Sequence, residues 1–88
     1  MPIQRTFIKD PKASYNLPSK ADIRAVLGER LRELRHKHGQ SQLELARTLG
    51  KKSAAYIAFI ETGDRNITAV DLFRMAHHFK VKASYFYS

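Results

Sequence analysis

Three glycines divide the chain into short segments of helical periodicity, and this division limits the possible folds more than any other feature. Gly39 and Gly50 each follow a stretch in which apolar residues recur three or four positions apart, and Gly63 with Asp64 forms a turn signal. A glycine just beyond such a stretch is typical of a helix C-terminus. Helices this short cannot bury an apolar face alone. The pattern therefore predicts several helices that pack on one another around one core.

Capping signals indicate where the helices begin. Three serine or threonine residues stand three positions before an acidic residue, which is typical of the first turn of a helix. These pairs are Ser19 with Asp22, Ser41 with Glu44, and Thr68 with Asp71. We expect helices from Ser19 to just before Gly39, from Ser41 to Gly50, from about Ser53 to Glu61 and from Thr68 to Phe79, and a last short turn from Ser84 to Phe86. The predicted fold is an all-α five-helix bundle in one domain, residues 19–88.

Apolar residues at helical spacing indicate the core. They are Ile23, Val26, Leu27, Leu31 and Leu34 in the first helix, Leu43, Leu45, Ala46 and Leu49 in the second, and Val70, Leu72, Phe73, Met75, Ala76 and Phe79 in the fourth. The third helix is expected to bury Ile57 and Ile60. Phe59 is expected to belong to the core and to cover the fourth helix or the arm, and the alternative for it is an intercalating wedge. Gly28 is expected to weaken the middle of the first helix by about 1 kcal/mol.

Residues 1–18 show no helical period and contain three prolines. We expect a flexible N-terminal arm that becomes ordered only when it meets a partner or packs back on the core. Its basic residues Arg5, Lys9 and Lys12 could reach phosphates.

The charge of the chain points to a polyanionic partner. Sixteen lysines and arginines against eight acidic residues give a net charge of +8, which suits nucleic acid, an acidic protein or an anionic membrane surface. No apolar run is long enough to cross a membrane and no signal peptide follows Met1, so we expect a soluble cytoplasmic protein. The absence of cysteine excludes a disulfide scaffold and the usual cysteine-rich zinc sites.

The second and third expected helices have the dimensions of a helix-turn-helix. Gly50 joins them, and Ala46 is small enough to let the second helix approach its neighbours closely. A reader of the major groove needs such a pair, because its second helix has to protrude from the protein. A generic αα-hairpin would satisfy the same spacing.

Beyond this spacing, the chain resembles the phage-repressor and Cro-like helix-turn-helix proteins, also called the XRE family. The resemblance rests on LGERLRELRHKHGQSQLELARTLG, YIAFIETGDRNIT and DLFRMAHHFKV, which together extend from Leu27 to Val81. It implies a domain of the lambda-repressor type that binds double-stranded DNA. Members act most often as repressors and as homodimers on a two-fold operator.

The family pattern, carried over residue by residue, makes Arg35 and Glu61 a structural ion pair between the first and third helices. It places Gln42 at the start of the second helix, where its amide and the free backbone N–H groups would hold a phosphate. The alternative for Gln42 is an ordinary polar surface residue. Ser41 is expected chiefly to cap this helix, and it could also contact DNA.

The third helix departs from the family pattern. Relatives commonly carry Gln, Arg, Lys or Asn near its start, after a turn that is one residue shorter. This chain has Ser53, Ala54, Ala55 and Tyr56 there. Alanine can touch only a thymine methyl, Ser53 can form one hydrogen bond, and Tyr56 could reach a phosphate or a sugar. Specificity would then depend on DNA shape and on the spacing of two half-sites.

Basic and polar side chains around this helix are the expected phosphate contacts, and one of the turn lysines could instead reach a guanine. They are Arg47, Lys51, Lys52, Arg65 and Asn66. The alternative for each of them is a solvated surface position.

Signals of catalysis and of metal binding are weak. The four histidines do not have the spacing of helical metal ligands, and no phosphate-binding loop or nucleophile elbow is present. These histidines are His36, His38, His77 and His78. We expect no enzyme, no cofactor, no metal and no small-molecule substrate.

Two alternatives stay open at this point. The same fold could serve as a protein-binding module, such as an antitoxin-like adaptor, that holds a protein partner with its apolar third helix or its arm. A cluster of apolar and aromatic residues near the C-terminus is either a dimer surface or part of the core. This cluster consists of Val81, Tyr85, Phe86 and Tyr87.

Overall fold

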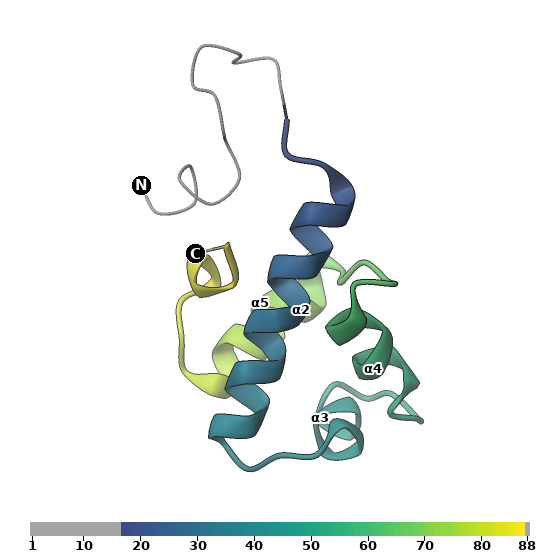
Figure 1. The fold of residues 1–88 in the computed structure, drawn as a ribbon. Coiled ribbons are helices and arrows are strands. Elements are labelled where there is room, and N and C mark those ends of the chain that lie inside the picture. Colours follow the sequence, from purple (N-terminus) through teal and green to yellow (C-terminus); the bar gives the residue numbers. More distant parts are fainter. Residues whose placement is uncertain (1–16, 88) are drawn as a thin grey trace.

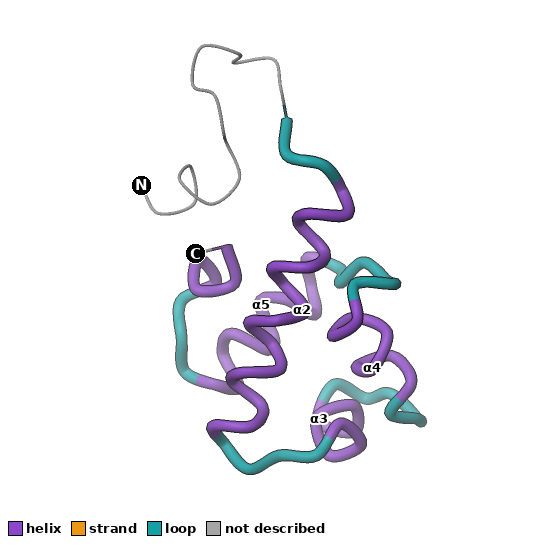
Figure 2. The backbone as a smooth tube through the Cα atoms, in the orientation of Figure 1, coloured by secondary structure: helices purple, strands orange, loops and turns teal. Residues whose placement is uncertain are grey.

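The computed structural model describes residues 17–87, in which helices joined by turns and loops are present without a strand. The elements are α2 (Lys20–Lys37), α3 (Gln42–Thr48), α4 (Ala55–Thr62), α5 (Ala69–Phe79) and the 3-10 helix η1 (Ala83–Tyr87) (Figures 1 and 2). The all-helical fold class is confirmed. The expected count of five α-helices is not, because the last turn within the described residues is a 3-10 helix. Apart from Leu17 and Pro18, the predicted N-terminal arm lies outside the described residues.

Hydroxyl caps begin three of the helices. The side-chain oxygens of Ser19, Ser41 and Thr68 accept hydrogen bonds from the backbone N–H three residues later, at 3.0, 3.0 and 3.1 Å. Only Ser41 completes a capping box, since the Glu44 carboxylate accepts from the Ser41 N–H at 2.8 Å. These bonds satisfy backbone donors that a helix start leaves without partners.

The start of α4 was predicted two residues too early. Its N-cap is Ala54, which offers no side-chain hydrogen bond, and the helix begins at Ala55. Ser53 lies in the preceding turn, where its hydroxyl accepts from the Ala55 N–H at 3.2 Å. The serine therefore stabilises the turn instead of capping the helix, and α4 depends on packing for its stability.

Gly28 marks the point where α2 and α4 approach each other most closely. A Cβ atom at this position would lie 2.4 Å from the backbone oxygen of Ile60 and 2.7 Å from that of Glu61. Any side chain would push the two backbones apart. The glycine that weakens α2 in isolation is therefore the residue that lets α4 pack against it.

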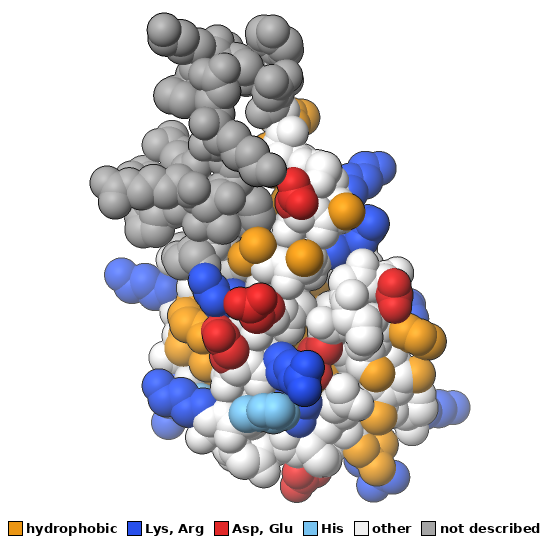
Figure 3. All heavy atoms as spheres, in the orientation of Figure 1, with side chains coloured by type: hydrophobic (Ala, Val, Ile, Leu, Met, Phe, Trp, Pro, Cys, Tyr) orange, Lys and Arg blue, Asp and Glu red, His pale blue; other side chains and the backbone are white. Residues whose placement is uncertain are grey.

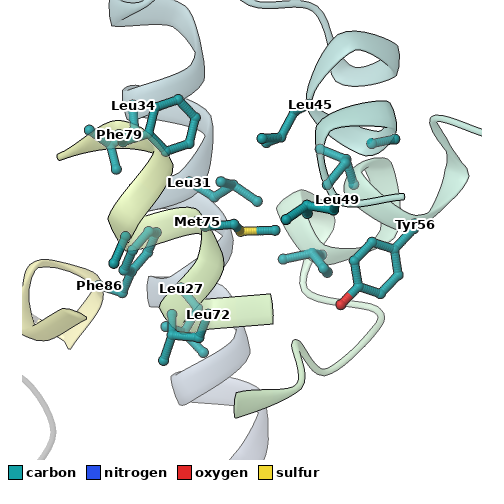
Figure 4. Close-up of a cluster of buried hydrophobic side chains, with 14 residues drawn as sticks. Leu27, Leu31, Leu34, Leu45, Leu49, Tyr56, Leu72, Met75, Phe79 and Phe86 are labelled. Carbon is teal, nitrogen blue, oxygen red and sulfur yellow. The ribbon is translucent and has the colours of Figure 1, made fainter. Parts of the chain in front are cut away.

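The core is built from side chains of every described helix (Figure 4). In Figure 1, α2 lies between η1 on one side and α4 on the other, and it packs against both. Phe86 of η1 is 1% exposed, and the remaining residues of the C-terminal cluster are half-buried against the same core. That cluster thus closes the domain. The buried apolar residues are Leu27, Leu31, Leu34, Leu45, Ala46, Leu49, Tyr56, Ile57, Ile60, Leu72, Met75, Ala76, Phe79 and Phe86.

Four residues expected in the core lie at the surface instead. Val70 is 67% exposed, Phe73 63%, Phe59 49% and Leu43 39%. Val70, Phe73 and Phe59 each stand one position from a buried residue, so they point about a quarter turn away from the face that packs. Leu43 stands two positions before the buried Leu45 and points away from that face as well. The expected apolar stripes were therefore too wide. A narrower stripe on each helix fills the core, and the remaining apolar residues form part of the outer surface.

None of the described helices is both long enough and apolar enough to cross a membrane. Within residues 17–87, no group of three or more histidine or acidic side chains lies close enough together to hold a metal ion.

Candidate nucleic-acid interface

The turn between α3 and α4 sets the angle at which α4 leaves the core. Gly50 adopts a left-handed conformation with φ of 78°, and the N–H of Lys51 donates to the oxygen of Ala46 at 2.9 Å. This is the arrangement that ends many helices at a glycine. Ala46 is fully buried, so α3 packs closely on its neighbours, as its small side chain predicted.

One face of α4 is buried and the other is open to solvent. Tyr56, Ile57 and Ile60 point into the core, whereas Ala55 and Phe59 are exposed. In Figure 3, hydrophobic side chains gather over α4, with lysine and arginine side chains beside them. The open face of α4 is therefore uncharged and accessible. The positive charge beside it belongs to side chains of neighbouring segments.

Three cationic side chains near α4 are exposed to solvent: Arg47 in α3, Lys52 in the turn, and Arg65 in the loop that follows α4. Ser53 and Asn66 are exposed as well, and Ala54 is half-buried. Asn66 is linked to α2, because Arg24 donates to its side-chain oxygen at 3.4 Å and to the Gly63 oxygen at 2.9 Å. Sequence reasoning missed this role of Arg24 in fixing the loop after α4.

The structure contains the expected ion pair between Arg35 and Glu61. The Arg35 Nε atom lies 2.6 Å from Glu61 Oε2, and a second guanidinium nitrogen donates to Oε1 at 3.0 Å. Both side chains are at least nine-tenths buried. The guanidinium also donates to the Gln40 oxygen at 2.9 Å. The pair therefore ties α2 to the end of α4 and to the loop before α3.

Gln42 joins this network from the first turn of α3. Its side-chain nitrogen donates to Glu61 Oε1 at 3.1 Å. The side-chain amide is thus turned toward α4. The expected contact of Gln42 with a phosphate stays a prediction: its backbone N–H group could make this contact as it stands, and its side chain would first have to move. Ser41 is exposed and caps α3.

Tyr56 has a different role from the predicted one. Its side chain is 7% exposed, and its hydroxyl donates to Asp71 Oδ2 at 2.5 Å. The ring packs in the core between α4 and the rest of the bundle (Figure 4). The expectation that Tyr56 reaches a phosphate or a sugar is wrong, because the hydroxyl points inward to a buried carboxylate.

Asp71 is a buried charged residue whose contacts with α4 and the turn before it were not predicted from the sequence. Its side chain is 5% exposed, Lys51 Nζ lies 3.3 Å from Oδ2, and Arg74 lies 3.6 Å from Oδ1. Burial raises the pKa of Asp71, but hydrogen bonds from Tyr56 and Lys51 and the charge of Lys51 outweigh it, and the pKa lies below its ordinary value. A signal was present: Asp71 lies four residues before Met75, on the buried stripe of α5.

The Tyr56 ring is flanked by two cations. Lys51 Nζ lies 4.5 Å from the ring centroid and the Arg65 guanidinium carbon lies 4.9 Å from it. Burial, followed by the hydrogen bond to Asp71 and the Asp71 charge, raises the pKa of the Tyr56 phenol. Two of the expected phosphate contacts, Lys51 and Arg65, are thus held against the base of α4.

The model of the helix-turn-helix family HTH_3 matches residues 31–86, well over half of the chain. This chain belongs to the HTH_3 family. The expected resemblance to XRE-family proteins is thereby confirmed. HTH_3 regulators are DNA-binding proteins, and the family is generally non-enzymatic.

Solved structures agree with this assignment. The restriction-modification controller protein C.AhdI from Aeromonas hydrophila is 32% identical over 72% of this chain and 94% of its own, with a TM-score of 0.65. The hypothetical transcription factor NHTF from Neisseria is 34% identical over 83% of each chain, with a TM-score of 0.69. No curated protein sequence matches the chain.

A longer relative shares the same domain. The HTH_3 family transcriptional regulator from Vibrio cholerae is 25% identical over 77% of this chain, with a TM-score of 0.68. The match spans 38% of that regulator's length. As an HTH_3 member whose relatives are controllers and transcription regulators, this chain is a DNA-binding regulator.

Proposed function

We propose that the chain is a sequence-specific transcriptional repressor that binds double-stranded DNA as a homodimer and places α4 in the major groove. The observation that carries this proposal is the open, uncharged face of α4 between exposed cationic side chains on α3, the turn and the following loop. An uncharged face fits between the two phosphate ridges of a groove, while the flanking cations meet the phosphates.

Few side chains would read bases directly. Ser53 can form one hydrogen bond to a base edge, and Ala54 and Ala55 can contact thymine methyl groups. Most of the specificity would come from DNA shape and from two half-sites about one helical turn apart. Recognition of the distance between two half-sites requires a dimer, because one protomer binds only one half-site.

Phosphate contacts would come from the rim of α4. Lys52, Arg47 and Arg65 supply charge, and Asn66 supplies an amide donor. The backbone N–H group of Gln42 completes the set, because the start of α3 carries a partial positive charge. In this proposal the protein performs no chemistry and needs no cofactor, and repression follows from occupancy of the operator.

Selection of bound sites from randomised duplexes tests the proposal. The expected result is a two-fold symmetric motif with A·T-rich positions under α4 and half-site centres about one helical turn apart. Sedimentation of the complex on the selected duplex should give two protomers per site. Failure to enrich any motif, or a single protomer on an asymmetric site, would overturn the proposal.

A second function is favoured by one observation, the 49% exposure of Phe59 on the open face of α4. An exposed aromatic ring on an uncharged helix also suits a protein partner, as in an antitoxin-like adaptor. The substitutions Lys52→Ala and Phe59→Ser separate the two functions. DNA regulation predicts that Lys52→Ala weakens DNA binding in an intact fold, whereas an adaptor predicts that only Phe59→Ser affects partner binding.

A further inference from the structure

A buried carboxylate on α5 contacts both α4 and the turn that precedes it. Asp71 reaches across to two segments of the helix-turn-helix: its Oδ2 atom accepts from the Tyr56 hydroxyl on α4 at 2.5 Å, and it lies 3.3 Å from Lys51 Nζ in the turn. The side chain of Asp71 is 5% exposed, while that of Lys51 is 36% exposed. The lysine therefore comes in from the surface to neutralise a charge inside the domain.

The two lysines of the turn are in different environments. The Lys51 ammonium lies between the Asp71 carboxylate and the face of the Tyr56 ring, 4.5 Å from the ring centroid. Lys52, the next residue, is exposed to solvent. Of these two adjacent lysines, Lys51 therefore directs its charge toward the protein interior and Lys52 directs its charge toward solvent.

We propose that Asp71 is a positioning residue for the start of α4, and that it keeps Lys51 away from DNA so that Lys52 is the turn lysine that contacts phosphate. This inference rests on the proposed function. It also names which of two neighbouring lysines takes part in binding, a distinction that the sequence does not make.

The energetics favour this division. To reach a phosphate, Lys51 would have to leave a buried carboxylate, whose remaining partners would be the hydroxyls of Tyr56 and Thr68 and the more distant Arg74. Loss of the nearest cation from a buried charge is costly. Lys52 has no such cost. A lysine that is already paired within the protein releases no counterion from DNA, so it does not contribute to the salt dependence of binding.

Salt dependence of binding to a mixed-sequence DNA duplex, followed by fluorescence anisotropy, tests the proposal. The slope of log K against log salt should become shallower by about 0.9 per bound protomer in Lys52→Ala and should not change in Lys51→Ala. In Asp71→Asn it should become steeper by about 0.9, because Lys51 is released. Asp64→Asn is the matched control, since it removes an exposed carboxylate beyond the other end of α4.

An equal loss of slope in Lys51→Ala and Lys52→Ala would overturn the proposal, as would an unchanged slope in Asp71→Asn. A slope that rises equally in Asp64→Asn would also overturn it, since the effect would then reflect net charge alone. If Asp71→Asn does not fold, as judged from its amide NMR spectrum, the two lysine variants decide the question.

A readout without DNA separates this proposal from the proposed function. The NMR signal of the Tyr56 ring can be assigned because it disappears in Tyr56→Phe. In the wild type this phenol should titrate with a pKa above its ordinary value of 10.0. Asp71→Asn should bring its pKa back toward that value, and Asp64→Asn should not. Absence of DNA binding by the wild type would refute the proposed function as a regulator. An unchanged Tyr56 pKa in Asp71→Asn would refute the positioning role of Asp71.

Discussion

Two carboxylates, Glu61 and Asp71, and the Arg35 guanidinium are buried beside a core of apolar side chains. Each carboxylate is compensated by a cation and by a neutral donor, Gln42 or Tyr56. The described residues contain no buried side-chain nitrogen or oxygen without a hydrogen-bond partner. At the scale of single residues, polar pairs therefore fix how the helices of the helix-turn-helix are oriented, and apolar contacts hold them together.

The pair between Arg35 and Glu61 should be costly to break from one side. Glu61→Gln leaves the Arg35 guanidinium buried without its counter-charge, and we expect a loss of about 3–5 kcal/mol in the free energy of unfolding. Urea denaturation followed by circular dichroism measures this. Glu33→Gln, which removes an exposed partner of Arg30 at 3.2 Å, is the control and should cost less than about 1 kcal/mol. Equal losses in both variants would contradict a buried, structural pair.

Acid should remove the stabilisation that Asp71 provides. Because its pKa in the folded protein lies below the ordinary value of 3.8, the stabilisation is complete above that pH and is lost as the pH falls through the lowered pKa. At neutral pH we expect Asp71→Asn to be less stable by about 1–3 kcal/mol. The stability difference between wild type and variant, measured by urea denaturation at a series of pH values, should shrink below pH 3.8. A difference that is constant from neutral to acid pH would argue against a charged Asp71 as the source.

At the scale of elements, the contact between α2 and α4 decides where α4 lies. Gly28 allows the two backbones to touch, and the left-handed Gly50 turns the chain between α3 and α4. The ion pair at Arg35 then fixes the C-terminal end of α4, and Asp71 fixes its N-terminal end. The open face of α4 is thus presented by a frame held at both ends.

Gly28→Ala should destabilise the domain, although the same change in an exposed helix is stabilising by roughly 0.5–1 kcal/mol. The new Cβ would lie 2.4 Å from the Ile60 oxygen, so α4 has to move. We expect a loss of about 1–3 kcal/mol, which thermal or urea denaturation would detect. Glu29→Ala, at the exposed neighbouring position, should stay within about 0.5 kcal/mol of the wild type. An increase in stability for Gly28→Ala would show that the helices are not in contact there.

The cap of α3 should matter more than the serine before α4. Ser41→Ala removes the hydroxyl that accepts from the Glu44 N–H at the start of a seven-residue helix, whereas the backbone N–H of residue 41 can still donate to the Glu44 carboxylate. We expect a loss of about 1 kcal/mol. Ser53→Ala removes one turn hydrogen bond at 3.2 Å and should cost less than half as much. Chemical denaturation of the two variants side by side makes the comparison. A larger loss of stability in Ser53→Ala than in Ser41→Ala would indicate that Ser53 caps α4 after all.

Much of this frame was predictable from sequence, because its signals are local. Ser19, Ser41 and Thr68 cap helices as their spacing to the next acidic residue indicates, and the resemblance identified Arg35 and Glu61 as a pair. The contacts of Asp71 and the crossing at Gly28 depend on residues far apart in the chain, so no local pattern contains them. Phe59, Val70 and Phe73 were misplaced because an apolar residue at helical spacing can lie on either edge of a stripe.

At the scale of the whole molecule, the net charge of +8 sets how the protein meets DNA. If about six to eight cationic contacts form, log K should fall with log salt at a slope of about −5 to −7, by the relation of about −0.9 per phosphate. Titration of a duplex at several NaCl concentrations measures this slope. Lys82→Ala is the control, because Lys82 precedes η1 on the other side of α2 from α4 and should leave the slope unchanged (Figure 1). Binding that is almost independent of salt would remove the electrostatic basis of the proposed function.

Closure of the core by Phe86 has a consequence for how the domain is made in the cell. The first described helix, α2, packs against both α4 and η1, so the side that faces η1 stays uncovered on a nascent chain until residue 86 has been synthesised and has left the ribosome. During this interval the unfinished chain is a substrate for chaperones and proteases. A ribosome stalled shortly before that codon would therefore yield a product that is degraded instead of a shortened regulator.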